Sequence, residues 1–302
     1  INATYPPTTV ASTNGMLSAR YPIENGWMGW SQYFNKYEQC VDVFRDENTA
    51  TRIKLPNGAS PINEFCSYKN IVTLINECNK KEIAKMVMPS FAMEGGATST
   101  KHFFKLINER IKDEDTKFIY CYYTEPDATM HIKGIEHKSV HKLILKLDKY
   151  IEKLVNDNKD VTFITIADHG MINHVHIDLD KYPKIIECLE RPGSLEKRTV
   201  SLKVKEEYKA NFKEIFNKSL GGFAKFFDIY TIDEALDMEL FGKGELHPLA
   251  KEFIGNFVVC ANDVFSLYQT SMMQSDEIFL TGHHAGKTLD ERLINISVYN
   301  NK

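Results

Sequence analysis

One apolar stretch near the middle of the chain, residues 161–171, limits the possible folds most strongly. Residues 161–166 are all β-branched or aromatic, and Asp168, His169 and Gly170 follow them. A run of this kind predicts a strand buried on both faces, as in a parallel sheet with helices on each side. Ligands bind at the carboxyl ends of strands in such sheets, so Asp168 and His169 are candidates for binding a divalent ion such as zinc. The alternative is a surface turn in which Asp168 caps the next helix.

A second apolar stretch, residues 118–123, ends in a similar pair. Asp127 and His131 follow it four residues apart, so a helical turn that begins after Pro126 would place both side chains on one side. Between the two stretches, residues 135–155 carry apolar side chains at helical spacing, which predicts the crossover helix of a β–α–β unit. Two strands that both end in an Asp/His pair indicate a dinuclear metal site.

These patterns predict an α/β fold with a mostly parallel sheet and helices on both faces. The 302 residues suffice for one large domain with an insertion. We assign residues 1–173 and 248–302 to a metal-binding core, with a loop-rich elaboration at 31–85. In residues 174–247 polar and apolar side chains alternate and charged residues are frequent. This pattern predicts a small inserted, cap-like α+β subdomain.

The composition narrows the function classes. Hydrophobic residues make up 43% of the chain and charged residues 26%, as expected for a globular protein with a sizeable core. The net charge of −4 argues against a nucleic-acid polymer as partner, and no apolar run is long enough for a membrane span. Six cysteines without CxxC spacing favour a reducing, cytoplasmic setting, although a leader upstream of Ile1 stays open. The sequence does not indicate an oligomeric state.

The N-terminal region offers a candidate anion site. Pro6 and Pro7 precede a predicted helix, so Thr8 or Thr9 would lie at a helix N-terminus, where free N–H groups favour an anion. A hydroxyl there could be a plain N-cap or a nucleophile, and the local residues favour the cap. In the loop that follows, Asn25, Trp27 and Trp30 are candidates to line a substrate pocket or to fill the core.

Further histidines occur near the C-terminus and after Met171. His283 and His284 lie in a glycine-flanked loop whose spacing does not match a phosphate-binding P-loop, so we interpret them as a third contribution to the metal site. His174 and His176 alternate as on a strand and are weaker ligand candidates. The pair His137 and His141 lies among lysines and is assigned to a solvated helix face.

Five motifs, taken in order, carry a resemblance to a known family. They are PPTT, SARYPIENGW, EPDATMH, ADHGM and GHHAG, and they extend over most of the chain. The ordered set resembles the alkaline-phosphatase superfamily, in particular its nucleotide pyrophosphatase/phosphodiesterase-like branch. The resemblance implies that Thr9 is the nucleophile. It also implies one metal held by Asp127, His131 and His284, with His283 as the less favoured neighbour.

The second metal implied by the resemblance would be held by Asp168, His169 and Thr9. The family adds an Asp from a first strand, which would precede Ile1. At the position of a phosphate-contacting Asn in nucleotide pyrophosphatases this chain has Trp30, and Asn25 is out of register. Substrate preference is therefore not carried over from the nucleotide-specific members, and Trp30, Asn25 and Trp27 are kept as candidate substrate-binding residues.

The expected function is metal-dependent hydrolysis of phosphodiester or pyrophosphate bonds through a phosphothreonine intermediate. Two divalent ions, zinc or alternatively manganese, would assist, and the substrate would be a small phosphate ester or a nucleotide-like molecule. A phosphomonoesterase, a sulfatase or a phosphonate hydrolase on the same scaffold is the alternative. A non-catalytic metal- or phosphate-binding protein is the alternative from another class, motivated by the first-strand Asp that the sequence does not contain.

Overall fold

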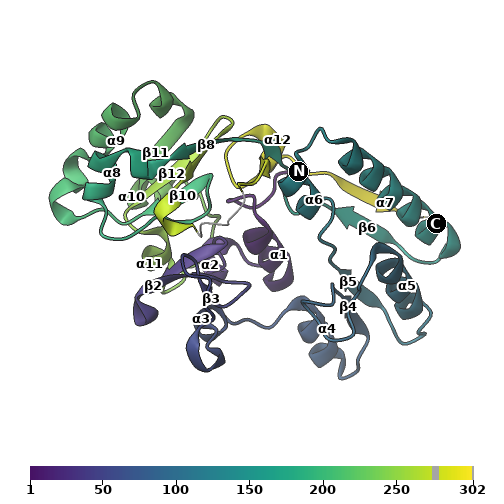
Figure 1. Ribbon diagram of the computed structural model, residues 1–302. Helices are drawn as coiled ribbons and strands as arrows, with labels where there is room; N and C mark the ends of the chain where they lie inside the picture. The colour runs from purple at the N-terminus through teal and green to yellow at the C-terminus, as the bar shows by residue number, and fades with distance from the viewer. Residues whose placement is uncertain (274–278, 301–302) are drawn as a thin grey trace. The chain divides into compact units, whose positions relative to one another are not determined.

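The computed structural model describes residues 1–273 and 279–300, and it divides into two compact units (Figure 1). The first unit combines Ile1–Tyr68 with Asp168–Ile294, and the second combines Lys69–Ala167 with the described residues from Asn295 onward. Each unit is described by itself. No helix in the described ranges is both long enough and apolar enough to cross a membrane.

A seven-stranded sheet forms the centre of the first unit. Its strands, in order across the sheet, are β11 (Phe227–Thr231), β12 (Phe257–Ala261), β10 (Thr199–Leu202), β9 (Ser194–Leu195), β1 (Ser31–Phe34), β2 (Gln39–Asp42) and β3 (Glu47–Asn48). Each pairing recorded between these neighbours is antiparallel. Segments from the beginning, middle and end of the chain therefore share one sheet.

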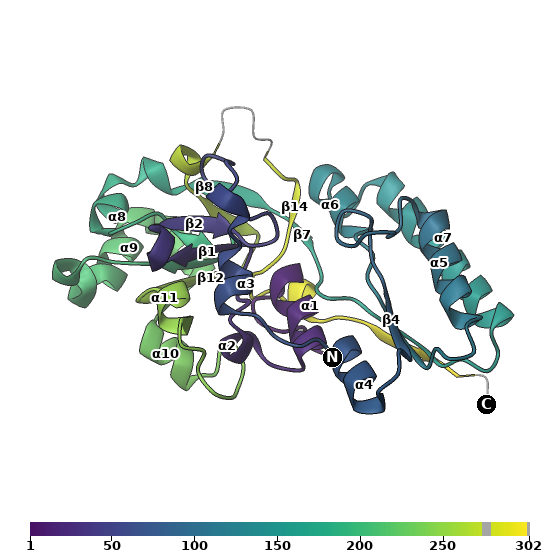
Figure 2. The ribbon, with the colours of Figure 1, turned by 90° about the horizontal axis from the view of Figure 1, so that it is seen from below.

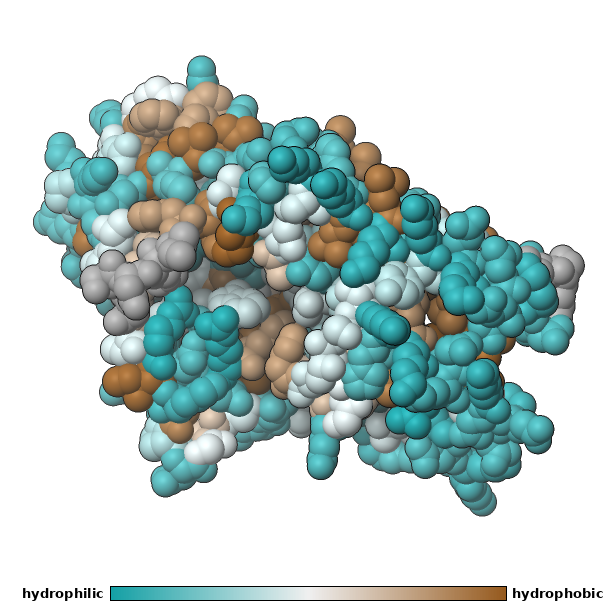
Figure 3. Space-filling model, turned by 45° about the vertical axis from the view of Figure 1, so that its right-hand side comes forward, coloured by the Kyte–Doolittle hydropathy of each residue, from teal (hydrophilic) through white to brown (hydrophobic). Residues whose placement is uncertain are grey.

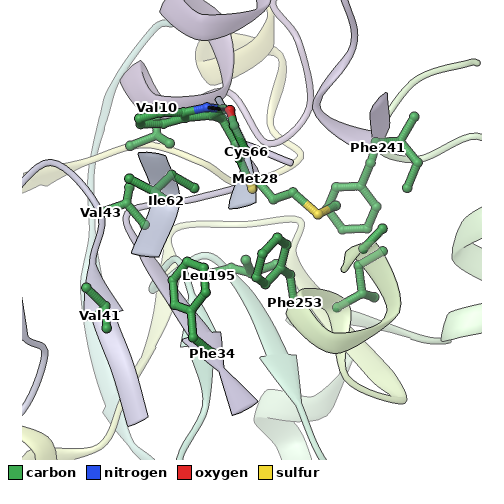
Figure 4. Close-up of a cluster of buried hydrophobic side chains, with 14 of the residues drawn as sticks. Val10, Met28, Phe34, Val41, Val43, Ile62, Cys66, Leu195, Phe241 and Phe253 are labelled. Carbon is green, nitrogen blue, oxygen red and sulfur yellow. Dashed lines mark hydrogen bonds between the residues drawn. The ribbon is translucent and has the colours of Figure 1, made fainter. Parts of the chain in front are cut away.

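Two apolar clusters cover the two faces of this sheet. Val258 and Cys260 of β12 belong to one cluster, whereas Phe257, Val259 and Ala261 belong to the other. Neighbouring side chains of a strand point to opposite faces, so β12 is buried on both sides. Figure 4 shows the first cluster, in which residues from α1, β1, β2 and the segment around Phe241 meet; among them are Val10, Phe34, Val41 and Phe253.

Helices and short strand pairs complete the first unit. The helices are α1 (Thr9–Ser18), α2 (Pro22–Asn25), α3 (Pro61–Phe65), α8 (Pro183–Cys188), α9 (Phe212–Leu220), α10 (Ile232–Asp237), α11 (Ala250–Ile254) and α12 (Leu289–Arg292). Short 3₁₀ helices span Asn35–Tyr37, Pro56–Gly58, Leu179–Lys181, Glu206–Asn211, Gly221–Phe226 and Thr270–Met272. Strand β8 (Val175–Asp178) pairs in parallel with β13 (Phe265–Tyr268), and β7 (Ile172–Asn173) pairs antiparallel with β14 (Gly282–His283).

The second unit is built from two strand pairs and four helices. Strands β4 (Ala84–Val87) and β5 (Phe118–Cys121) pair in parallel, and β6 (Phe163–Ile166) pairs antiparallel with β15 (Ile296–Tyr299). The helices are α4 (Ile71–Asn79), α5 (Thr100–Ile111), α6 (Asp127–Lys133) and α7 (Lys138–Asp157). Helices α5 and α7 lie side by side (Figures 1 and 2), and the rings of Phe104 and Tyr150 stack between them with centroids 4.7 Å apart.

The exposed surface is polar over most of the face shown in Figure 3, where apolar side chains are scattered among hydrophilic ones. Helix α7 fits this pattern, because Val140, Leu154 and Val155 are buried whereas its lysines are exposed. The sequence expectation of a solvated lysine-rich face is consistent with this arrangement.

The α/β class predicted from the sequence is confirmed, and so are the strands at 118–121 and 163–166 and the helix between them. The mostly parallel pairing holds for β4 with β5 and for β8 with β13, whereas the seven-stranded sheet is antiparallel. An apolar run shows only that a strand is buried on both faces, and an antiparallel sheet between two cores produces the same run.

Three finer expectations differ from the structure. Burial of residues 161–166 on both faces is wrong, because Ile164 and Ile166 are 62% and 38% exposed. The segment 174–247 does not form a separate insertion, because β9, β10 and β11 share a sheet with β1 and β12. The elaboration expected at 31–85 is divided between the two units after Tyr68. The charged loops of 174–247 made the composition of this segment differ from that of the core, although its strands are part of the core sheet.

Candidate active site

Helix α1 begins where the sequence places a candidate anion site. Proline is disfavoured inside a helix, so α1 starts only after Pro6 and Pro7. Thr8 is the N-cap residue in an extended conformation, and Thr9 is the first helical residue. The side chain of Thr8 makes no capping bond. Its Oγ1 instead donates to Oε1 of Glu196 at 2.7 Å.

Thr9 lies beside His169. The Thr9 Oγ1 atom is 3.1 Å from Nε2 of His169, and Nδ1 of the same ring is 2.8 Å from the carbonyl oxygen of Gly170. A carbonyl can only accept, so Nδ1 donates in this contact, and Nε2 is the ring nitrogen that faces Thr9. The nearer carboxylate oxygen of Asp168 is 3.6 Å from Nε2. These side chains therefore form one polar group.

His284 joins this group from the other end of the first unit. Its ring stacks on that of His169 with centroids 3.8 Å apart, and its Nδ1 is 3.1 Å from the carbonyl oxygen of Pro7. The same reasoning assigns the hydrogen to Nδ1. Nδ1 of the neighbouring His283 lies 2.9 Å from the backbone nitrogen and 3.0 Å from the carbonyl oxygen of His284. The stacking of His284 on His169 favours His284 over His283 as the site residue.

A buried ion pair holds the loop that carries His284. Arg198 donates from Nε and Nη2 to the two carboxylate oxygens of Glu291 at 2.7 and 2.8 Å, and both side chains are fully buried. Glu291 also accepts the N–H of Gly286, and its own carbonyl accepts the N–H of Gly170. The pair therefore fixes the segments that follow His169 and His284.

Thr199 adds a second contact to the same loop. Its hydroxyl donates to the carbonyl oxygen of Ala285 at 2.5 Å, and Ala285 has a positive φ of 81°. Gly170 is required on the other side, since an added Cβ would meet the carbonyl oxygen of Asp290 at 1.8 Å. The loop backbone is thus closely packed on both sides.

Glu196 is the buried acid of the site. Its side chain accepts the Thr8 hydroxyl and the Trp30 N–H, the latter at 2.8 Å. Burial raises the pKa of Glu196 to about 7, although the two hydrogen bonds and the charge of His169 act in the opposite direction. The sequence analysis missed Glu196 and Arg198. Their sequence signal is that three ionisable residues, Glu196 to Arg198, immediately precede the fully buried strand β10.

In the second unit, Asp127 and His131 form the predicted pair. Helix α6 begins at Asp127, and one turn later Nε2 of His131 lies 3.3 Å from Oδ1 of Asp127. The expected helical turn after Pro126 is confirmed. The pair presents a carboxylate oxygen and an imidazole nitrogen on one side of α6, which are suitable donors for a divalent ion.

The three candidate substrate-binding residues differ in their surroundings. The Asn25 amide donates to Ser18 and Arg20 and accepts from Trp27, and the Trp27 indole donates to the carbonyl of Cys66. These two side chains therefore hold the loop and the core together. The Trp30 ring packs against Phe44 and Arg45, and its backbone is tied to Glu196. A substrate-binding role for these three residues stays a prediction.

The weaker histidine candidates are engaged elsewhere. His174 is hydrogen-bonded through Nδ1 to Ser266 and through Nε2 to the carbonyl of Leu280, at 2.6 and 2.8 Å. His137 accepts the N–H of Ser139 and caps α7. These contacts support the sequence-based preference for other ligands.

A threonine hydroxyl at a helix N-terminus, beside an imidazole nitrogen and a carboxylate, is an arrangement that can bind and cleave an anionic ester. The family model described as type I phosphodiesterase/nucleotide pyrophosphatase matches residues 1–287, so the chain belongs to that family. The family assignment confirms the resemblance given by the five motifs. The protein is therefore a hydrolase that acts on phosphodiester bonds.

Solved structures share the fold of this chain. An inactive variant of murine ectonucleotide pyrophosphatase/phosphodiesterase 5, in complex with AMP, superimposes on this chain with a TM-score of 0.70 at 14% identity. The match covers 100% of this chain and 79% of the murine chain. The human protein of the same name gives 0.68 at 13% identity over 99% of this chain and 78% of its own. A comparison with curated proteins gave no match. At these identities the structures establish the fold.

Proposed function

We propose that the protein cleaves phosphodiester or pyrophosphate bonds of small molecules through a phosphothreonine on Thr9, with two divalent ions bound nearby. The observation that carries the proposal is the 3.1 Å distance between Thr9 Oγ1 and Nε2 of His169, at the start of α1. A hydroxyl in this place has both an anion-binding helix end and a metal-binding nitrogen as neighbours.

The proposed ligands follow the family resemblance. Asp168, His169 and Thr9 would hold one ion, and Asp127, His131 and His284 the other. The donor chemistry fits, because Nδ1 of His169 and of His284 each face a backbone carbonyl, the usual support of a ligating histidine. Oxygen and imidazole donors suit zinc, with manganese as the alternative. When bound, such ions lower the pKa of a hydroxyl and neutralise charge on phosphoryl oxygens.

In the proposed reaction the chain binds and orients the ester. The backbone N–H groups at the start of α1 stabilise the phosphoryl oxygens, and the Thr9 Oγ forms a bond to phosphorus while the bond to the leaving oxygen breaks on the opposite side. Water then displaces Thr9 from phosphorus and restores its hydroxyl. Positioning and charge stabilisation supply most of the acceleration in such transfers.

Thr9→Ala tests the nucleophile. Turnover of bis-p-nitrophenyl phosphate by the zinc-loaded protein should fall by about 10³-fold or more, because the variant lacks the hydroxyl that would attack phosphorus. Thr51→Ala, an exposed threonine of the same unit, is the matched control. Parallel assays with p-nitrophenyl phosphate, the sulfate and a phosphonate ester separate a diesterase from the alternative hydrolases. Unchanged diesterase turnover in Thr9→Ala would refute the assignment.

The substrate class and the compartment are part of the proposal. A small, nucleotide-like phosphate ester is supported by the murine relative, whose structure contains AMP. All six cysteines are free thiols, of which four are buried, and this supports a reducing compartment such as the cytoplasm. Fractionation of the source cells, with immunodetection of the protein, tests this location.

A further inference from the structure

Thr8 has the backbone of a helix cap but not its side-chain bond. Its φ of −141° and ψ of 150° are those of an N-cap residue, and α1 begins at the next residue. A capping threonine would accept the N–H of the second or third helical residue, here Val10 or Ala11. In this protein its hydroxyl donates to Glu196 instead.

Glu196 is well placed to hold that hydroxyl. Its side chain is only 8% exposed, and its Oε1 accepts both the Thr8 hydroxyl and the Trp30 N–H. The preceding Leu195 pairs with Ser31 of β1 and with Val200 of β10, so the central sheet carries the acid. A hydrogen bond to a carboxylate is stronger than one to a neutral acceptor, and it fixes the Thr8 side chain in an orientation in which its oxygen accepts no N–H of the helix.

We propose that Glu196 is a positioning residue that keeps the first turn of α1 open for the substrate phosphoryl group by withholding the Thr8 hydroxyl from it. The inference rests on the proposed function, because it requires the phosphoryl group to bind at Thr9. An uncapped helix end offers its N–H groups to an anion, whereas a side-chain cap occupies one of them. The hydroxyl and the phosphoryl group thus compete for the same donors.

Phosphate binding by the purified protein, measured by calorimetry, tests the competition. Glu196→Met removes the acceptor at similar side-chain length and frees Thr8 to cap the helix. The dissociation constant for inorganic phosphate should rise about fivefold, the factor that corresponds to one capping hydrogen bond. Adding Thr8→Val removes the competing hydroxyl and should restore the affinity. Glu196→Gln keeps an oxygen acceptor and should recover most of it.

Two further variants control for damage to the fold. Thr8→Asn supplies a strong capping oxygen while Glu196 stays in place, so it should weaken phosphate binding by a similar factor even if Glu196→Met does not fold. Glu190→Met removes an exposed acid from the same unit and is the matched control. A merely structural role for Glu196 would not produce rescue by a second substitution at Thr8.

Hydrogen exchange gives a readout that needs neither ligand nor turnover. In Glu196→Met the amides of Val10 and Ala11 should exchange more slowly than in the unsubstituted protein, and Thr8→Val should reverse the change. Unchanged or faster exchange of these amides, or no rescue of phosphate affinity by Thr8→Val, overturns the inference. An absence of diesterase turnover in the unsubstituted protein would refute the proposed function alone, so the two failures are distinguishable.

Discussion

At the scale of single residues, the site depends on which ring nitrogen carries the hydrogen and on one buried acid. Backbone carbonyls accept a hydrogen from Nδ1 of His169 and of His284, so Nε2 is the nitrogen of each ring that would bind a metal ion. The sequence predicted both histidines and Thr9 from their motifs. It could not predict Glu196, because a glutamate beside Lys197 and Arg198 looks like part of a solvated run, and only the fold shows that it is buried.

Glu196 should give stability a distinct pH dependence. Its folded pKa of about 7 lies above the ordinary value of 4.5, so the native protein binds the proton more tightly than the unfolded chain does. The resulting stabilisation is complete below about pH 4.5 and is lost as the pH rises to about 7. Relative to Glu196→Gln, the unsubstituted protein should lose roughly 3 kcal/mol across this range. Urea unfolding at several pH values measures it, and parallel stability profiles for the two proteins would contradict it.

At the scale of secondary-structure elements, the spacing of residues along the sequence predicted the helices, whereas the pairing of strands was not predictable. Helix α7 was predictable because its apolar residues repeat at helical intervals, and α6 because Asp127 and His131 are four apart after a proline. The antiparallel order of the large sheet was not predictable, because β1 and β2 come from the first fifth of the chain whereas β9 to β12 follow some 150 residues later. Long-range pairing leaves no local signal.

Strand β10 and helix α12 are joined by the Arg198–Glu291 pair, which should be sensitive to single substitutions. Glu291→Leu leaves a fully buried guanidinium without its partner and should cost about 3–5 kcal/mol of unfolding free energy. Arg198→Met combined with Glu291→Leu removes both charges and should be less destabilising than Glu291→Leu alone. Chemical denaturation of the three proteins measures these differences. A double variant less stable than the single one would show that the ion pair is not the source of the effect.

At the scale of the whole molecule, the proposed ligands come from both units. Asp127 and His131 belong to the second unit, whereas Asp168, His169 and His284 belong to the first. The sequence predicted the α/β class and the family over nearly the whole chain, since ordered motifs are specific. It did not predict the boundary between the units, because the first is assembled from two segments that no composition change marks.

Removal of metal should lower the stability of the first unit. Thr9, Asp168 and His169 all belong to that unit, and an ion that they bind only in the folded form stabilises it by mass action. We expect the calorimetric transition of the first unit to move to lower temperature after treatment with EDTA, and readdition of zinc should restore it. Identical thermograms with and without metal would argue against an ion at these three residues.

The short segment from Glu196 to Thr199 touches both reactive loops while it leads directly into β10. The geometry of the proposed active site therefore depends on a strand of the central sheet and not on a movable loop. Heating should abolish turnover only when the sheet itself melts, so the inactivation temperature and the melting temperature of the first unit should coincide.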